Sequence, residues 1–515
     1  MQRLSASKGK QPLLLSKKRI LLAPWQVVLL LSAYIGIVLN SVVFMRRFAE
    51  LGAASVVSVA AYSETPLLML FDELALVFSF TALLLSLSYL SGKWVARLLV
   101  VSLLTISVLA SYYMTFFNVV IGYGVVQAVL TTDVDLSKEA VGVGLLLWFV
   151  GLTVIPVALW WRYVAVRRDA STGWAMQFKQ WTARLGLVAL FAATFAVIAQ
   201  RVNSDTPEQT SAAAVGQDIG QASLAAHTYV PSNWVAGLGM SASSALDEWV
   251  SKDQKLDPAQ TFQYSQTSPG DAVDDVTLVV VIGESARSSN FGLLGYERPT
   301  TPFLAAEKNL VAFKATSCNT STKLSLQCMF VRPQGVVDRG MQAPQILEET
   351  VFSVLKKLGY STELFAMQSE VWFYNSLKTD FYKIREVIAA DTANRGKPVI
   401  DALLGTELSA SMAKHPKGHH AIVLHTKGSH FSYASRYPRE FAKYLPECDG
   451  VDGACSKAQL INAYDNSILY TDTFLHDLMT RLADKKAVLI YTSDHGESID
   501  EKPSLPCDPQ APGPA

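Results

Sequence analysis

The sequence has no excess of charge of one sign. Its 44 lysine and arginine residues equal its 44 aspartate and glutamate residues, so the net charge at pH 7 is zero. A chain without a basic excess has no general electrostatic attraction to nucleic acid, and we expect no nucleic-acid partner. We also expect no cleaved signal peptide, because the first apolar run is long enough to remain in a membrane as an anchor.

Long apolar runs dominate the first 200 residues, whereas residues 250–500 have the pattern of a soluble domain. A chain of 515 residues is too long for one compact core, so at least two domains are expected. A helix needs about 20 apolar residues to cross a bilayer. Runs that meet or approach this length are Trp25–Phe44, Leu67–Leu90, Leu98–Phe117, Val141–Trp161 and Leu185–Gln200. The sequence therefore predicts a transmembrane α-helical domain of five spans over residues 1–201.

Basic residues near the span ends predict the orientation, because cytoplasmic loops are enriched in lysine and arginine. The segments that fall on one side of the membrane contain Lys17, Lys18, Arg19, Lys93, Arg97, Arg162, Arg167, Arg168, Lys179 and Arg184. The opposite loops hold Arg46, Arg47 and Lys138, and the two arginines are a mild exception. The N-terminus is therefore expected in the cytoplasm and everything after Arg201 outside.

Residues 202–272 are rich in serine, alanine, glycine and glutamine. We expect a partly helical bridging segment that lies along the membrane face and contacts both domains. Trp234 and Trp249 are its isolated large side chains. Tryptophan is favoured at membrane interfaces, but packing in a protein core explains these two residues equally well.

Beyond residue 273, short apolar runs alternate with amphipathic stretches. The predicted strands are Val276–Ile282, Ala421–Leu424 and Ala487–Tyr491, and the predicted helices include Ile346–Leu358 and Ser456–Leu482. Buried strands separated by helices indicate an α/β domain whose mainly parallel sheet is covered by helices on both faces. We place this domain over residues 273–501.

Acidic residues and histidines follow the predicted strands: Glu284, then His425 with His430, then Asp494 with His495. Ligands of open α/β sheets bind beyond the carboxyl ends of the strands, and carboxylate and imidazole groups suit zinc. Each residue also has an ordinary alternative. Glu284 could lie in the first turn of a helix, the Asp494–His495 pair could make a structural hydrogen bond, and either other histidine could belong to the core.

Thr322 lies in a cluster of serine and threonine residues between Cys318 and Cys328. It could simply begin a helix in a polar loop. Alternatively, metal coordination could lower the pKa of its hydroxyl enough for nucleophilic attack. A hydroxyl and a metal ion at strand ends provide the chemistry of phosphoryl or sulfuryl transfer through a covalent intermediate.

The cysteines form two close pairs, Cys318 with Cys328 and Cys448 with Cys455, and leave Cys507 unpaired. No C-x-x-C motif occurs, which weakens the interpretation that these thiols bind zinc. Because this half of the chain is predicted to lie in an oxidising compartment, we expect both pairs to be disulfides. The first disulfide would hold the Thr322 loop rigid for a positioned attack.

Three motifs resemble those of the phosphoethanolamine transferases of Gram-negative bacteria, membrane enzymes with a sulfatase-like domain of the alkaline phosphatase superfamily. They are V-I-G-E-S-A-R around Glu284, S-C-N-T-S-T…C-M-F around Thr322 and Y-T-S-D-H-G-E-S around Asp494. The stretches A-M-Q-S-E-V-W-F-Y-N, L-H-T-K-G-S-H-F and A-Y-D-N-S-I-L-Y-T-D are most similar to the branch that modifies the outer Kdo sugar of Kdo-lipid A. The resemblance extends to Glu501.

The resemblance implies a monomeric enzyme of the bacterial inner membrane with its catalytic domain in the periplasm. Thr322 would take phosphoethanolamine from phosphatidylethanolamine and release diacylglycerol. A sugar hydroxyl of lipopolysaccharide, such as that of Kdo-lipid A, would then attack the phospho-threonine. The implied zinc ligands are Glu284, Thr322, Asp494 and His495. His425 and His430 would bind substrate phosphate or a second zinc ion.

After Glu501 the sequence departs from the family, whose members continue with H-x-H-[AG]-T-P. Residues 502–515 form a proline-rich tail with Cys507. Codons exist for this tail that, read one base out of step, spell S-H-H-F-H-A-T-P-R-H-L-A. We therefore expect a frame shift that leaves the catalytic domain incomplete and the chain unstable or nearly inactive. The nucleotide sequence of the gene tests this directly.

Other functions share parts of the pattern. A sulfatase-like hydrolase usually needs a cysteine or serine that becomes formylglycine, which Thr322 does not offer. A phosphoglycerol transferase of the same superfamily would fit the threonine, and only contacts to the headgroup and acceptor would separate it. A remnant that binds lipid without catalysis is the alternative from a different class.

Overall fold

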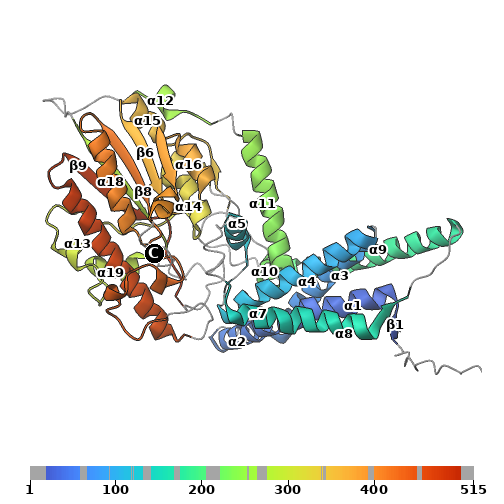
Figure 1. The fold of residues 1–515 in the computed structure, drawn as a ribbon. Coiled ribbons are helices and arrows are strands. Elements are labelled where there is room, and N and C mark those ends of the chain that lie inside the picture. The colour runs from blue at the N-terminus through green and yellow to red at the C-terminus, as the bar shows by residue number, and fades with distance from the viewer. Residues whose placement is uncertain are drawn as a thin grey trace, which may run out of the picture.

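The structure is a computed structural model. It describes residues 19–57, 66–91, 93–117, 119, 121–131, 141–167, 174–204, 221–251, 255–263, 275–337, 339, 344–391, 400–448 and 455–499. A helical bundle and an α/β domain lie beside each other, with further helices between them (Figure 1). The predicted proline-rich tail at residues 502–515 lies outside the described residues.

The bundle consists mainly of long apolar helices. Its elements are α1 (Pro24–Ala33), the π-helical turn η1 (Tyr34–Val38), α2 (Ser41–Val57), α3 (Pro66–Ser88), α4 (Lys93–Phe116), α7 (Val143–Phe149), the π-helical turn η2 (Val150–Val154), α8 (Ile155–Tyr163) and α9 (Trp174–Ser204). A short parallel pair, β1 (Ile20–Leu22) and β2 (Val164–Val166), lies at the end of the bundle far from the α/β domain (Figure 1).

Four stretches in the described residues are long and apolar enough to cross a membrane: Leu67–Ser88, Trp94–Phe116, Val143–Tyr163 and Phe178–Val202. Helices satisfy their own backbone hydrogen bonds, as lipid requires. The structure thus confirms four of the five predicted spans. The first predicted span is a pair of helices, Pro24–Val38 and Ser41–Ala49, bent by 47°, and it counts as a fifth span only if the pair crosses together.

The bend in this first segment lies at Asn40, whose side chain is buried in the bundle. Its amide donates to the carbonyls of Gly36 (3.0 Å) and Val230 (2.7 Å), and its oxygen accepts from the Val230 N–H (2.9 Å). Asn40 therefore holds Val230, a residue within the predicted bridging segment, inside the bundle.

A second polar cluster holds the same segment. The Tyr229 hydroxyl donates to Glu73 at 2.6 Å, and Glu73 pairs with Arg47 at 3.3 Å. Arg46 donates to two carbonyl oxygens at the end of α4, at 2.8 and 2.6 Å. The two arginines that were exceptions to the predicted charge pattern thus make specific contacts within the bundle.

The bridging region contains α10 (Gln221–Thr228), α11 (Ser232–Ser251) and α12 (Pro258–Thr261). Helix α5 (Tyr123–Thr131), which follows α4 in the chain, packs against α11. Gly237 of α11 approaches Val126 of α5 so closely that a Cβ on the glycine would lie 2.7 Å from the valine Cγ2. Helix α11 runs crosswise to the spans, between the bundle and the α/β domain (Figure 1).

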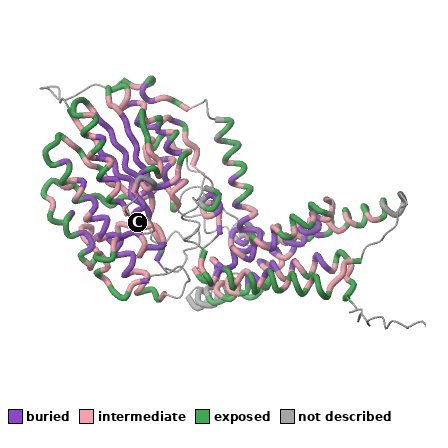
Figure 2. Tube along the Cα trace, in the orientation of Figure 1, coloured by how far each residue is buried: buried purple, intermediate pink, exposed green. Residues whose placement is uncertain are grey.

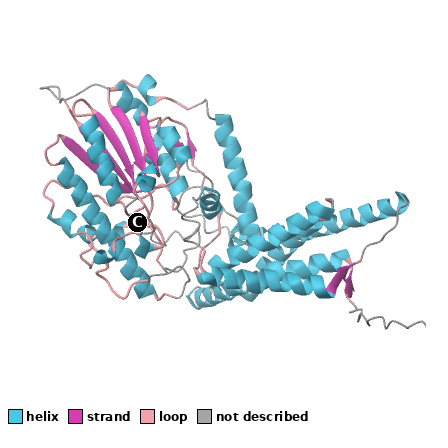
Figure 3. Ribbon diagram, in the orientation of Figure 1, coloured by secondary structure: helices cyan, strands magenta, loops and turns pink. Residues whose placement is uncertain are grey.

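The α/β domain contains a five-stranded parallel sheet in the order β7–β6–β8–β3–β9 (Figure 3). The strands are β3 (Thr277–Gly283), β6 (Ser361–Ala366), β7 (Phe381–Ile384), β8 (His420–His425) and β9 (Ala487–Ser493). The register pairs Gly283 with Ser493 and Ile282 with His425. The carboxyl ends of β8, β3 and β9 are therefore level with one another.

Helices cover both faces of this sheet, as predicted. They are α13 (Pro302–Ala306), α14 (Thr322–Met329), α15 (Phe352–Lys357), α16 (Val371–Leu377), α17 (Glu386–Ala390), α18 (Ala402–Lys414) and α19 (Lys457–Leu482), with short 3-10 turns at Ser288–Asn290, Gly292–Leu294, Pro333–Gly335, Tyr433–Ser435 and Arg439–Phe441. Residues of α18 and α19 pack on Val279 and Val281, whereas α14, α15 and α16 pack on the opposite face around Ile282. Figure 2 shows the central strands buried.

The predicted strands at β3, β8 and β9 and the predicted helix at α19 are confirmed. The predicted helix Ile346–Leu358 is wrong in its first half. Its start, β5 (Gln345–Ile346), pairs antiparallel with β4 (Val336–Val337). The isolated bridge between Leu256 and Glu348 continues this extended conformation, so the helix begins only at Phe352.

Replacing Asn40 with alanine (Asn40→Ala) should destabilise the chain, because the buried N–H and C=O of Val230 would lose their partner. We expect a loss of roughly 1–3 kcal/mol, measured as a lower midpoint of thermal denaturation in detergent. The control Thr194→Ala removes an exposed hydroxyl of α9 and should change little. An unchanged midpoint for Asn40→Ala would contradict the proposed anchoring.

Candidate metal-binding catalytic site

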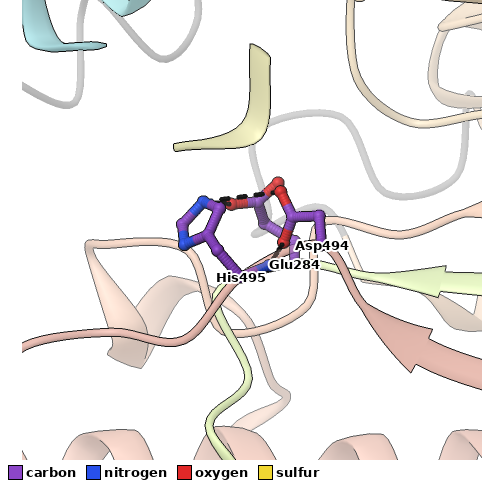
Figure 4. A group of neighbouring side chains, drawn as sticks. All are labelled: Glu284, Asp494 and His495. Atoms are coloured by element: carbon purple, nitrogen blue, oxygen red, sulfur yellow. Dashed lines mark hydrogen bonds and ion pairs between the residues drawn. The ribbon is translucent and has the colours of Figure 1, made fainter. Parts of the chain in front are cut away.

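Three predicted ligands meet at the carboxyl ends of β3 and β9. Glu284 directly follows β3, and Asp494 and His495 directly follow β9, which is paired with it. One ligand atom from each residue lies within 4.8 Å of the others. Figure 4 shows the three side chains turned toward one another. Because the carboxyl ends of these two neighbouring parallel strands are level, residues about 210 positions apart in the chain lie together.

Thr322 joins this group from the first turn of α14. Its Oγ1 lies 3.3 Å from each carboxylate oxygen of Glu284 and 3.2 Å from Nε2 of His495. The threonine is half-buried, whereas Glu284 and Asp494 are fully buried. All four residues that were predicted to share a metal ion therefore converge.

Backbone groups orient the Asp494–His495 pair. Oδ1 of Asp494 accepts from the N–H groups of Ser285 (3.1 Å) and His495 (2.7 Å). Nδ1 of His495 lies 2.5 Å from the Gly496 carbonyl, which can only accept, so this nitrogen carries the proton. Nε2 of the same ring then faces Glu284 at 3.3 Å, on the side where a metal ion would lie.

The loop after β8 packs directly on Glu284. Ser429 donates its N–H to the Glu284 carbonyl at 2.9 Å. Gly428 adopts a positive φ of 48°, and a Cβ there would lie 2.7 Å from the Glu284 nitrogen. Only glycine fits this position, because both the left-handed backbone and the close approach exclude a side chain.

Gln368, which follows β6, was not predicted as a site residue. Its amide donates to Oε2 of Glu284 at 2.6 Å and to the Thr426 carbonyl at 3.1 Å, and it lies 3.5 Å from Nε2 of His425. The side chain is buried. Gln368 lies just beyond the carboxyl end of β6. Had that strand been predicted, this position would have marked Gln368 as a candidate site residue.

The two remaining predicted histidines lie outside the three-residue metal group. His425 is fully buried, with its Nδ1 2.7 Å from the Tyr374 hydroxyl. Burial lowers its pKa to about 4, so the ring is neutral at pH 7. His430 lies in the next loop, with Nδ1 2.6 Å from the Phe431 carbonyl, and burial lowers its pKa too.

The buried charges of the cluster depend on one another. Burial raises the pKa of Asp494, and the negative charge of Glu284 raises it further. Burial acts to lower the pKa of His495, but Asp494 and Glu284 outweigh it and raise the pKa to about 10. Burial acts to raise the pKa of Glu284, yet the hydrogen bond and charge of His495 bring it below its ordinary value. At pH 7 without a metal, the imidazolium of His495 therefore lies beside an ionised Glu284, whereas Asp494, whose pKa is raised to about 8, is mostly protonated.

The donor set fits zinc. Oδ2 of Asp494 is buried, has no hydrogen-bond partner and lies 3.4 Å from Nε2 of His495. A buried carboxylate oxygen without a donor is costly unless a cation compensates it. Two carboxylates, one imidazole and a hydroxyl at hand match the ligand types and the coordination number that zinc prefers.

Both predicted disulfides are present. Cys318 pairs with Cys328, and Cys448 pairs with Cys455. The first joins the loop before Thr322 to the last turn of α14, so Thr322 lies within the loop of chain that this disulfide closes.

Comparison with known proteins gives consistent matches over both domains. A family model described as Sulfatase matches residues 276–513, and one described as Phosphoethanolamine transferase EptA/EptB matches residues 78–204. The chain is 43% identical over 481 residues to the Kdo(2)-lipid A phosphoethanolamine 7''-transferase of Escherichia coli (strain K12), covering 92% of this chain and 82% of that protein. The Salmonella typhimurium protein of the same name matches with the same identity and coverage.

A solved structure matches over both domains as well. It is the integral membrane protein lipooligosaccharide phosphoethanolamine transferase A (EptA) from Neisseria meningitidis. The TM-score is 0.70 with 26% sequence identity, and the match covers 92% of this chain and 83% of that one. The similarity therefore includes the relation between bundle and α/β domain.

Zinc binding to the metal-free chain should release protons at pH 7. His495, with a pKa of about 10, is protonated at that pH and must lose a proton to become a ligand. The apparent affinity should therefore fall as the pH falls. Asp494, with a pKa of about 8, is mostly protonated too and must also ionise to bind the metal. Isothermal titration calorimetry in two buffers of different ionisation heat measures the release, roughly between one and two protons per zinc. Equal heats in both buffers would contradict this prediction, and the exposed His476→Ala should behave like the unmodified chain.

Gln368→Leu should weaken metal binding, because Glu284 would lose a buried donor. We expect a loss of roughly 10–100-fold in zinc affinity, measured by competition with a chromophoric chelator. The matched control is Gln260→Leu, at an exposed position of α12. If both variants bind zinc equally well, Gln368 does not orient the metal ligands.

Proposed function

This chain belongs to the phosphoethanolamine transferase family, and we propose that it transfers phosphoethanolamine from phosphatidylethanolamine to a Kdo sugar of Kdo-lipid A through a phospho-threonine at Thr322. The acceptor follows the printed activity of the relatives at 43% identity. The observation that carries the proposed chemistry is the position of the Thr322 hydroxyl, 3.3 Å from Glu284 and 3.2 Å from His495.

The proposed reaction has two displacements at phosphorus. Thr322 Oγ1 attacks the phosphorus of phosphatidylethanolamine, and the bond from phosphorus to the glycerol oxygen breaks. Diacylglycerol leaves with a proton, and the threonine carries phosphoethanolamine as an ester. A Kdo hydroxyl then attacks the same phosphorus, the bond to Oγ1 breaks, and the threonine regains a hydroxyl proton. The net transfer is of phosphoethanolamine to the sugar and of the sugar proton to diacylglycerol.

Several groups of the protein would make this reaction possible. Glu284, Asp494 and His495 would hold a zinc ion beside Thr322. Such an ion supplies positive charge that lowers the pKa of a hydroxyl and stabilises phosphoryl oxygens. The disulfide between Cys318 and Cys328 would keep the threonine oriented.

Two contacts support a lipid as the donor. Lys323, next to Thr322, bonds to Gln127 of α5 at 2.5 Å. Phe431, next to His430, makes an edge contact with Phe117 at the end of α4, with ring centroids 6.0 Å apart. Both contacts join the catalytic cluster to the part of the chain that follows the span α4, which supports a substrate that arrives from the membrane.

The two histidines outside the metal group would have different roles. His430 lies in the loop that meets the membrane domain, and we assign it to the phosphate of the incoming substrate. His425 is buried behind Gln368 and held by Tyr374, so we assign it to positioning rather than to substrate contact.

The charge pattern of the loops supports an orientation of the chain in the membrane. We propose that the catalytic domain faces the periplasm and that the N-terminus is cytoplasmic, because Arg46 and Arg47, the exceptions on the opposite side, are engaged in the bundle. We propose a monomer as the working unit, since all four cluster residues come from one chain.

Thr322→Ala should abolish transfer, because no oxygen remains to accept phosphorus, whereas Thr322→Ser should retain part of it. We expect a loss of at least about 1000-fold for alanine. Because the chain as written is expected to be nearly inactive, the variants are made in a version whose reading frame is restored after Glu501. Mass spectrometry of lipid A from cells expressing this version measures the phosphoethanolamine-sized increment on the Kdo-containing fragment. Thr320→Ala, at a neighbouring exposed position, serves as the control.

Three results would argue against parts of this proposal. An increment that survives in Thr322→Ala would exclude the phospho-threonine. An increment on the glucosamine backbone alone would exclude Kdo as the acceptor. A phosphoglycerol-sized increment would identify a different donor.

A further inference from the structure

On helix α11, polar side chains lie on the side that faces the protein and apolar side chains on the outer side, the reverse of an ordinary surface helix. Its protein-facing side carries Ser241, Ser244 and Asp247, which line a cavity of about 130 Å³ shared with α5 and α14. Asp247 is bonded to Arg339 of the α/β domain at 2.6 Å. Ser241 and Ser244 therefore face the protein, and Asp247, although its side chain is 55% exposed, is paired with the α/β domain.

The outward side of α11 is apolar. Leu246, Trp249 and Val250 are 60%, 76% and 59% exposed, and Leu238 is 39% exposed. With Ala242 these residues follow the spacing i, i+4, i+8, i+11 and i+12, so they form one stripe along the helix. No part of the chain that the structure describes covers this stripe, and Figure 2 shows α11 mostly exposed beyond the bundle.

The stripe is continuous with the membrane domain. The first turn of α11 is buried in the bundle, where the Trp234 indole donates to Ser107 of α4 at 3.2 Å. From there the helix runs crosswise to the spans, past their ends (Figure 1). A helix in this position lies along the membrane surface rather than through the bilayer.

We infer that the stripe Leu238–Ala242–Leu246–Trp249–Val250 is inserted into the lipid interface on the side of the catalytic domain. Apolar side chains with a tryptophan on one face and polar groups on the other are typical of helices that lie in such an interface. This inference goes beyond the proposed reaction. It makes α11 a second attachment to the membrane, which would hold the catalytic domain at a fixed height above the lipid headgroups.

A second copy of the chain is a weaker occupant for this face. A 20-residue helix is about 30 Å long and roughly 10 Å wide, so one face offers about 300 Å². A stable protein interface needs about 800 Å² from each partner. The lipid surface requires no such area, because the spans already hold the chain in the membrane.

Spin labels test this inference in the full chain. Leu246→Cys and Trp249→Cys, each in a Cys507→Ser background, would carry a nitroxide, and the protein would be reconstituted in discs of phosphatidylethanolamine and phosphatidylglycerol. Collision with oxygen, which concentrates in lipid, and with a water-soluble nickel chelate is measured by power saturation. The matched control is Val488→Cys, a 53% exposed apolar position on β9, on the side of the α/β domain away from the spans (Figure 1).

Labels at positions 246 and 249 should collide more with oxygen and less with nickel than the label at position 488. Nickel access equal to that at position 488 would show that the stripe faces water and would overturn the inference. Protection from both reagents would show that protein covers the stripe, which would overturn it as well. The measurement needs no turnover, so its failure would leave the proposed transferase reaction untouched.

Discussion

Two carboxylates, Glu284 and Asp494, are buried side by side at the ends of adjacent parallel strands, and their mutual repulsion is the constraint around which the catalytic domain is arranged. His495 supplies positive charge, backbone N–H groups bind one side of Asp494, and Gln368 donates to Glu284. One oxygen of Asp494 still has no donor. A cation would compensate this cluster, and one held there would supply the positive charge that stabilises phosphoryl oxygens.

The same cluster is connected to the membrane domain on two sides. The residue after Thr322 bonds to α5, and the residue after His430 packs against the end of α4. Helix α5 packs in turn on α11, and the residues just before α11, Tyr229 and Val230, are bonded to Glu73 and Asn40 in the bundle. These contacts connect the position of the catalytic cluster to the bundle through both α4 and α11.

The sequence predicted those parts of the molecule that depend on local patterns. Spans, buried strands and strand-end ligands were visible because apolar runs and the polar residues that end them are adjacent in the chain. Strand β6 was missed because Glu363 interrupts its apolar run. The structure shows this buried carboxylate bonded to Ser411, Lys414 and His415, which are about 50 residues away. Contacts between distant segments also explain why Gln368 and the bond from Lys323 to Gln127 escaped prediction.

In the bridging segment, the type of a residue alone does not determine whether its side chain is buried. Tryptophans 234 and 249 were indistinguishable in the sequence, yet Trp234 is 8% exposed and Trp249 is 76% exposed. The difference arises because α11 leaves the bundle after its first turns, so the same helix begins in a protein core and ends outside it. The serines and the aspartate of α11 face the protein, so its apolar face would be left in contact with water if no lipid covered it. Its apolar face is favourable only against lipid, and the spans place that lipid within reach.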